Sequence, residues 1–194
     1  MILSDNELRA AIVHGQLIIT PPPADSHITT TSVDLTLGSE FRRWREAKGG
    51  AELTVNPSSP DFNFAAIVAE HTELIPANPD GSVVLNPGSF LLTATAERVE
   101  LPITSRLAAR VEGRSTLARL GVGVHVTAPT IHAGFRGVIT LEVTHHGTLP
   151  VRLRPGLRVC QLIVESVFGT PSVAMTGAFQ DQVSVAGGAP RTGR

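Results

Sequence analysis

The chain has 194 residues, of which 42% are hydrophobic, and this is enough for one domain with a sizeable core. Sixteen Lys and Arg residues oppose 17 Asp and Glu residues, and aromatic residues make up only 4% of the sequence. This composition supplies neither the basic surface nor the stacking platform of a protein that binds a nucleic acid polymer. The single cysteine, Cys160, excludes an internal disulfide and any two-cysteine zinc site, so we expect a small buried side chain in a strand.

The opening stretch MILSDNELRA lacks the basic segment followed by an apolar run that is typical of a signal peptide. No apolar run approaches ~18 residues, the length that a membrane-spanning helix needs. We therefore expect a soluble, cytoplasmic protein with no membrane partner.

The first predicted element is a helix over Ser4–Gly15. Ser4 and Glu7 have the spacing of a capping box, and Gly15 supplies the stop. Three consecutive prolines then break the chain. A second short helix is predicted around Pro60–Ala69.

The rest of the chain reads as short strands separated by turns that contain Gly, Pro and Asn. Strands are predicted over Ser32–Leu37, Ala51–Val55, Ser82–Leu85, Phe90–Ala96, Leu107–Val111, Val122–Thr127, Val138–Thr144, Val151–Leu153 and Arg158–Val164. Many short strands favour a sandwich, jelly roll or barrel over an alternating α/β fold. We predict a mainly β single domain over residues 1–194 with short peripheral helices, and a flexible C-terminal arm over residues 177–194.

Between two predicted strands lies the sequence GRSTLARLG, residues 113–121. On a helix, Ser115 and Arg119 share a face, and the Arg119 side chain leans back toward the N-terminal end. There the free N–H groups, the helix dipole and the Ser115 hydroxyl join the guanidinium in a site suited to an anion, which Arg114 strengthens. In the alternative interpretation, Ser115 is only an N-cap and the arginines are solvated or paired with carboxylates such as Glu112.

In the run GVITLEVTH, residues 137–145, apolar side chains alternate with Thr140, Glu142 and Thr144. Strand geometry therefore places Glu142 on the polar face, beside two hydroxyl groups. Glu142 is either an ordinary solvent-facing carboxylate or a general base in a cleft, with a pKa raised by burial.

The histidines do not form a metal site. His71-Thr72-Glu73 has the H-x-E form of zinc deaminases, but the required P-C-x-x-C is missing, which excludes that class. His145 and His146 are adjacent and would point to opposite sides of a strand, so they make a poor ligand pair. No P-loop, Rossmann fingerprint or nucleophile elbow is present.

Taken in order, several motifs resemble those of the dCTP deaminase family, which has the trimeric dUTPase-like fold. The motifs are SVDLTLG (Ser32–Gly38), NPGSFLL (Asn86–Leu92), GRSTLARLG, HVTA (His125–Ala128), GFRGVITLE (Gly134–Glu142) and LRPGLRV (Leu153–Val159). The likeness covers nearly the whole chain. It implies a distorted jelly-roll, or β-clip, fold assembled as a homotrimer with the sites between subunits.

The resemblance also implies a reaction, the hydrolytic deamination of dCTP or a close cytosine nucleotide to dUTP and ammonia. Glu142 would be the general base that activates water for attack on C4, without a metal in the chemical step and without zinc. Mg²⁺ would accompany the phosphates rather than a protein ligand cage, and the C-terminal arm would close over the nucleotide. The residues implied in substrate binding are Arg114, Ser115, Thr116, Leu117, Ala118, Arg119, Val126, Thr127, Ala128, His132, Thr140, Leu141 and Gln182.

Three positions depart from the family pattern. His132 stands where an aspartate usually holds the sugar 3′-hydroxyl, and Thr130 replaces an arginine of the single-activity deaminases. In the arm, Ala178 replaces the phosphate-binding lysine while Gln182 remains. Loss of one charge-assisted contact would weaken binding by roughly 1.5–3 kcal/mol.

Two other hypotheses stay open. One is hydrolysis of the phosphate chain, as in dUTPases and in bifunctional relatives that release dUMP and pyrophosphate. His132 counts against it, because in dUTPases the missing aspartate orients the attacking water. The other is a nucleotide-binding paralogue with little or no catalysis, which the substitutions at Thr130, His132 and Ala178 would suit.

Overall fold

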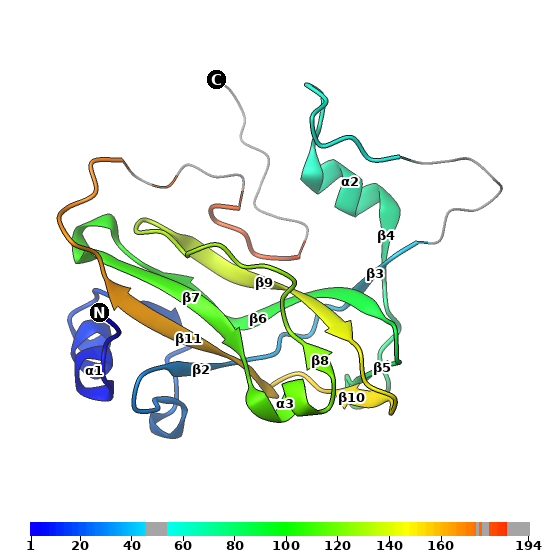
Figure 1. Ribbon diagram of the computed structural model, residues 1–194, viewed down its shortest axis with the longest axis horizontal. Helices are drawn as coiled ribbons and strands as arrows, with labels where there is room; N and C mark the ends of the chain where they lie inside the picture. Colours follow the sequence, from blue (N-terminus) through cyan, green and yellow to red (C-terminus); the bar gives the residue numbers. More distant parts are fainter. Residues whose placement is uncertain (46–53, 174, 176–178, 186–194) are drawn as a thin grey trace.

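The computed structural model describes residues 1–45, 54–173, 175 and 179–185, and in them strands predominate over helices (Figure 1). The helical elements are α1 (Asp5–Val13), η1 (Asp25–His27), α2 (Phe64–His71), η2 (Ile103–Ser105) and α3 (Ser115–Arg119). The strands are β1 (Ile18–Thr20), β2 (Val33–Thr36), β3 (Arg42–Trp44), β4 (Thr72–Leu74), β5 (Val83–Leu85), β6 (Phe90–Glu100), β7 (Leu107–Gly113), β8 (Val122–Gly123), β9 (Arg136–His145), β10 (Val151–Leu153) and β11 (Arg158–Ser166).

Two larger sheets hold the core between them. One has the strand order β4-β3-β6-β9-β8, with β1 also paired to β6, and the other has the order β2-β11-β7. Buried side chains from both sheets meet in one hydrophobic cluster, for example Leu35 and Leu162 from the second sheet with Leu91 and Leu141 from the first. β5 and β10 form a separate antiparallel pair. This two-sheet arrangement confirms the predicted mainly β fold.

The long antiparallel pair β6–β9 forms the centre of the larger sheet. Residue Leu92 of β6 lies opposite Glu142 of β9, and Ala94 lies opposite Thr140. On the same face, Leu92 and Ala94 join a small buried cluster with Val68 of α2 and Val185 of the C-terminal segment. Helix α2 and the C-terminal segment therefore pack over the face of the sheet that carries Glu142.

Helix α1 ends where the sequence predicts, because Gly15 takes a positive φ of 65° that favours glycine. Its start differs in detail from the predicted capping box. Ser4 precedes the helix, but its side chain caps no backbone N–H group and its hydroxyl donates to the Glu7 carboxylate instead. The predicted second helix is confirmed as α2, which begins later than expected because the Asn63 side chain caps it by accepting from the Ala66 N–H at 3.1 Å.

Most predicted strands are present, with shifted ends. The strand predicted over Val122–Thr127 is wrong beyond Gly123, because the chain leaves β9 there and enters a loop. Of the strand predicted over Ala51–Val55, residues 51–53 lie outside the described residues and 54–55 are not in a strand. The three-residue strands β1, β3 and β4 were not predicted.

Cys160 lies in the middle strand of the second sheet, β11, and is fully buried. Burial raises the pKa of its thiol well above the usual range. The expectation of a small buried side chain is confirmed. Within the described residues, no helix has both the length and the apolar character that crossing a membrane requires.

Candidate active site

Strand β9 presents Glu142 as its alternating sequence predicts. Leu141 and Val143 point into the core and are almost completely buried. Thr140, Glu142 and Thr144 lie on the other face and are half-buried. The Glu142 side chain is therefore half-buried rather than fully solvent-facing.

The surroundings of Glu142 raise its pKa above the ordinary value. The largest cause is burial, which disfavours the charged form. The pKa is lowered by backbone hydrogen bonds, from Val126 and within Glu142 itself, and by the nearby His125. These effects do not cancel the effect of burial. A carboxylate with a raised pKa is a stronger proton acceptor, as a general base requires.

His125 lies near Glu142, and from the sequence it was named only as part of the motif HVTA. Its Nε2 lies 4.0 Å from the Glu112 carboxylate, and it is close enough to Glu142 to affect the pKa of that group. Its Nδ1 is buried and has no hydrogen-bond partner among the described residues. The prediction of a continuous strand over Val122–Thr127 gave no reason to single out His125, because side chains along a strand simply alternate between its two faces.

Helix α3 exposes its polar side chains. The N-cap position is Arg114, no side chain caps the helix, and Ser115 is the first helical residue. The alternative in which Ser115 serves only as an N-cap is therefore wrong. The exposed residues of α3 are Ser115, Thr116, Ala118 and Arg119. Leu117 packs into the core with 8% exposure, so its side chain faces away from any ligand on this surface.

Arg114 points inward and pairs with a carboxylate. Its Nη1 donates to Asp34 of β2, a residue with 1% exposure. The alternative interpretation is therefore right that an arginine of this stretch pairs with a carboxylate, although the partner is Asp34 rather than its example, Glu112. The Arg114 side chain remains 27% exposed. Arg114 therefore lies directly before α3, and the buried Asp34 carboxylate fixes its position.

Helix α3 is tied to the end of β9 that follows Glu142. Gly121 ends the helical turn with a φ of 85°, and β8 then pairs with β9 through Val122–His145 and Gly123–Thr144. A methyl group on Gly121 would lie 2.2 Å from the backbone nitrogen of Gly147. This close approach fixes the position of α3 relative to β9.

The loop after β8 carries the remaining predicted substrate residues. Val126, Thr127 and Ala128 are exposed, Val126 at 63%. The loop is anchored again at Ile131, which exchanges two backbone hydrogen bonds with Ala109 of β7 at 2.7 and 2.9 Å. His132 and Thr130 are exposed beside this anchor.

The comparisons with known proteins agree with these features. Residues 2–167 match the family model described as dCTP deaminase-like. The chain belongs to this family.

Curated members of the family align over most of the chain. A protein of Methanosphaera stadtmanae named "dCTP deaminase, dUMP-forming" is 37% identical over 166 residues, which cover 86% of this chain and 79% of that protein. A "dCTP deaminase" of Rhodospirillum rubrum is 36% identical over 188 residues, covering 95% and 94%. The family thus includes relatives of both names at similar distance from this chain.

A solved member supports the fold. The structure of the 2′-deoxycytidine 5′-triphosphate deaminase from Agrobacterium tumefaciens superposes with a TM-score of 0.63 at 22% sequence identity. The match covers 85% of this chain and 47% of that one, so the present chain spans about half the length of its structural relative.

In the present protein, the described C-terminal residues pack against the sheet. Gln182 has 4% exposure; its Nε2 donates to the Val138 carbonyl at 2.5 Å, and the Val138 N–H donates to the Gln182 carbonyl at 3.0 Å. Val138 lies four positions before Glu142 on β9, roughly 13 Å along the strand. The structure therefore does not bring Gln182 to the Glu142 carboxylate, and Ala178 lies outside the described residues.

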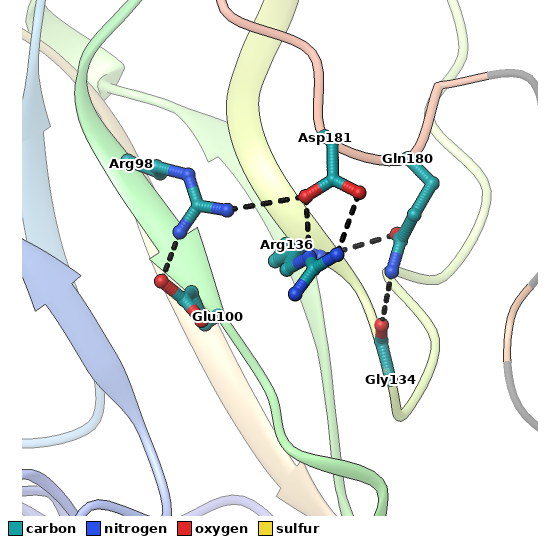
Figure 2. A network of polar contacts seen from close by, with 6 residues as sticks. All are labelled: Arg98, Glu100, Gly134, Arg136, Gln180 and Asp181. Atoms are coloured by element: carbon teal, nitrogen blue, oxygen red, sulfur yellow. Dashed lines mark hydrogen bonds and ion pairs between the residues drawn. The ribbon is translucent and has the colours of Figure 1, made fainter. Parts of the chain in front are cut away.

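Ion pairs hold the same segment (Figure 2). Asp181 accepts hydrogen bonds from Arg136 at 2.8 Å and from Arg98 at 3.3 Å, and Arg98 also pairs with Glu100. Gln180 donates to the Gly134 carbonyl at 2.7 Å. The hydrogen bond from Arg136 is the main cause that lowers the pKa of Asp181. Gln180, Asp181, Gln182 and Val185 of the predicted arm thus contact the rest of the fold in this structure, while Phe179 and Val183 are exposed.

A cavity of about 450 Å³ lies beside this packed segment. It contains neither Glu142 nor any residue of α3. Its lining consists of Leu37, Gly38, Ser39, Glu40, Ala94, Thr95, Ala96, Val138, Pro155, Gly156, Val183 and Ser184.

The side chains around α3 do not form a metal cage. Guanidinium groups cannot bind a cation, and the part of the chain that the structure describes contains no group of three or more His, Cys, Asp or Glu side chains placed to hold one. Any Mg²⁺ at this site would need ligands from the substrate and water.

Proposed function

We propose that this chain deaminates dCTP, or a close cytosine nucleotide, to dUTP and ammonia. Membership of the dCTP deaminase-like family supports the substrate class. The observation that carries the proposal is the environment of Glu142. Its side chain is half-buried, and this burial raises its pKa. Glu142 also lies beside Val126, on β9, the strand to which α3 is tied.

In the proposed reaction, Glu142 takes a proton from water as the water oxygen bonds to C4 of the cytosine, and the electron pair of the C4–N3 double bond moves to N3. The protonated Glu142 then delivers this proton to the exocyclic nitrogen, and the bond from C4 to that nitrogen breaks to release ammonia as the C4–N3 double bond re-forms. The remaining hydroxyl proton moves to N3, so water supplies the carbonyl oxygen of the uracil product. Burial favours both halves of the cycle, because a carboxylate with a raised pKa accepts the proton readily and holds it until the amine leaves.

The substrate would bind through the exposed groups around this carboxylate. Ser115 and Arg119 are exposed on α3 and would contact the phosphates with a hydroxyl and a guanidinium. The backbone of Val126, Thr127 and Ala128 would border the base. The side chains of Leu117 and Leu141 are buried in the core, so any contact of theirs would come from backbone atoms. Mg²⁺ would arrive on the phosphates, with no protein cage.

We further propose that the enzyme is a homotrimer with sites between subunits. The groups assigned to the substrate lie on an open surface of the single chain, and Val126 (63%) and Leu120 (50%) expose apolar side chains there. A neighbouring subunit would cover these side chains and exclude water from the reacting atoms. Sedimentation at micromolar concentration tests this, and a stable monomer would contradict it.

A second candidate function is the formation of dUMP by combined deamination and loss of pyrophosphate. The observation in its favour is the name of the Methanosphaera stadtmanae relative, "dCTP deaminase, dUMP-forming". The presence of His132 in place of the expected aspartate counts against it.

One experiment separates the candidates. Purified protein is incubated with dCTP and Mg²⁺, and ammonia, dUTP, dUMP and pyrophosphate are measured, with Glu142→Gln as the control. We expect ammonia and dUTP in equal amounts. Ammonia with dUMP and pyrophosphate would select the bifunctional reaction, and binding of dCTP without any product above the control would select a non-catalytic paralogue.

A further inference from the structure

Asp34 is a buried carboxylate that receives hydrogen bonds from three side chains, one that follows β7 and two on β11. It has 1% exposure in β2. Its donors are Arg114, which follows β7, the Nη1 of Arg158 at 3.2 Å, and the Nε2 of Gln161 at 3.3 Å. A buried charge is costly unless it is paired and hydrogen-bonded, and here each requirement is met.

The position of Asp34 is itself fixed by the second sheet. Asp34 lies directly opposite Gln161 in the β2–β11 pair, so both side chains point to the same face. Gln161 also donates to the Ser32 hydroxyl at 3.1 Å, which orients its amide toward Asp34. The carboxylate therefore has little freedom to move when its arginine partners are disturbed.

Asp34 has two arginine partners. This one carboxylate pairs with both Arg114 and Arg158, whose side chains are 27% and 45% exposed. Both arginines therefore reach the surface near the first residue of α3, where Ser115 and Arg119 are also exposed. A polyanion is a ligand that such a group of arginines suits.

We propose that Asp34 is a positioning residue for the substrate phosphates, acting through Arg114 and Arg158. It holds the two guanidiniums in one place at the start of α3, so that they need not be ordered when the nucleotide binds. The contact with Asp34 uses Nη1 of Arg114, and a guanidinium has five N–H groups, so others remain available for phosphate oxygens. This inference rests on the proposed function for the identity of the ligand, a nucleoside triphosphate.

The first test is Asp34→Asn, which keeps the shape of the side chain and removes its charge. We expect KM for dCTP to rise roughly ten-fold or more, with kcat nearly unchanged, because Glu142 is untouched. Binding of inorganic triphosphate, measured by calorimetry, should weaken by a similar factor. Binding of deoxycytidine, which has no phosphate, should be unchanged.

The matched control is Asp80→Asn. Asp80 also accepts a hydrogen bond from an arginine, Arg154, at 2.5 Å, but it lies outside the candidate site. This variant should leave KM and kcat as in the wild type. A rise in KM for Asp80→Asn equal to that for Asp34→Asn would overturn the proposal.

A double variant tests whether Asp34 acts through Arg114. If it does, Asp34→Asn combined with Arg114→Gln should bind triphosphate about as weakly as Arg114→Gln alone. Fully additive losses would overturn the inference, as would equal losses for deoxycytidine and triphosphate. If Asp34→Asn does not fold, triphosphate binding is measured on the two surface variants Arg114→Gln and Arg158→Gln instead. Wild-type triphosphate affinity in both would overturn the inference.

These outcomes separate the inference from the proposed function. If the wild-type protein binds dCTP without deaminating it, the proposed function fails while the triphosphate titrations still decide the role of Asp34. If the protein deaminates dCTP and Asp34→Asn has wild-type KM and triphosphate affinity, only the inference fails.

Discussion

The carboxylate of Glu142 lies against the backbone of Val126, so the residue proposed as the base and the loop proposed to border the base pocket meet directly. Glu142→Gln keeps the size of the side chain and removes its basicity. We expect the deamination rate to fall by roughly 10²- to 10⁴-fold, the usual contribution of a general base. Ammonia release under saturating dCTP measures this, and unchanged dCTP binding would show that the fold is intact.

The same substitution should stabilise the protein at neutral pH. The pKa of Glu142 is raised by burial, so its charged form costs folding free energy above that pKa. The glutamine variant avoids this cost. Chemical denaturation across pH should therefore show the variant to be more stable at pH 7 and the difference to vanish below the ordinary value of 4.5. A variant less stable than the wild type at pH 7 would contradict the assigned burial.

The pH dependence of kcat should reflect the same group. A general base must be deprotonated, so activity falls as the pH drops through the pKa of Glu142, which lies above 4.5. Because His125 lowers this pKa, His125→Asn should move the acid limb to higher pH. His14→Asn, at the exposed end of α1, is the control and should leave the profile unchanged.

Gly121 should be far less tolerant of substitution than other glycines with positive φ. Gly121→Ala places a methyl group 2.2 Å from a backbone atom of Gly147, in addition to the cost of a left-handed residue. We expect a loss of about 2–5 kcal/mol in unfolding free energy. Gly88→Ala has a similar φ of 78° but nothing within 4 Å, so it should cost only about 1–2 kcal/mol. Equal losses in denaturant titrations would show that the close approach does not matter.

Asp181 should keep the C-terminal segment packed. Its pKa is lowered by the hydrogen bond from Arg136, so this contribution is present above the ordinary value of 3.8 and is lost as the pH falls through the lowered pKa. Asp181→Asn should speed hydrogen exchange at the Val138 N–H, which donates to Gln182. Asp61→Asn, an exposed carboxylate, serves as the control. Equal exchange in both variants would argue against this role.

The sequence predicted the elements whose side chains alternate over many residues. β6, β9 and β11 each carry such a pattern, and Glu142 follows from its place in it. β1, β3 and β4 have three residues each; β1 and β3 pair with the longer β6, and β4 pairs with β3. Such short runs contain too little periodicity to be recognised.

The partners of the site residues could not be predicted in the same way. The pairing of Arg114 with Asp34 joins positions 80 residues apart, and the proximity of His125 to Glu142 depends on where the chain leaves β8. Glu112 is close to Arg114 in the sequence and was therefore the obvious candidate for its partner. In the folded chain, Arg114 pairs with Asp34 instead. Spacing identified which groups have suitable chemistry, and only the fold determined which of them meet.

The tie of α3 to β9 through β8 has a consequence for engineering. Apart from Asp34 and Arg158, the groups proposed to act on the phosphates, the base-bordering loop and the general base belong to one uninterrupted stretch, Gly113–His145. Transplanting that stretch as a cassette between relatives named dUMP-forming and those that are not would exchange nearly the whole reaction centre at once. The product made by such a chimera would reveal whether the outcome of the reaction is encoded inside the cassette or in the surrounding scaffold.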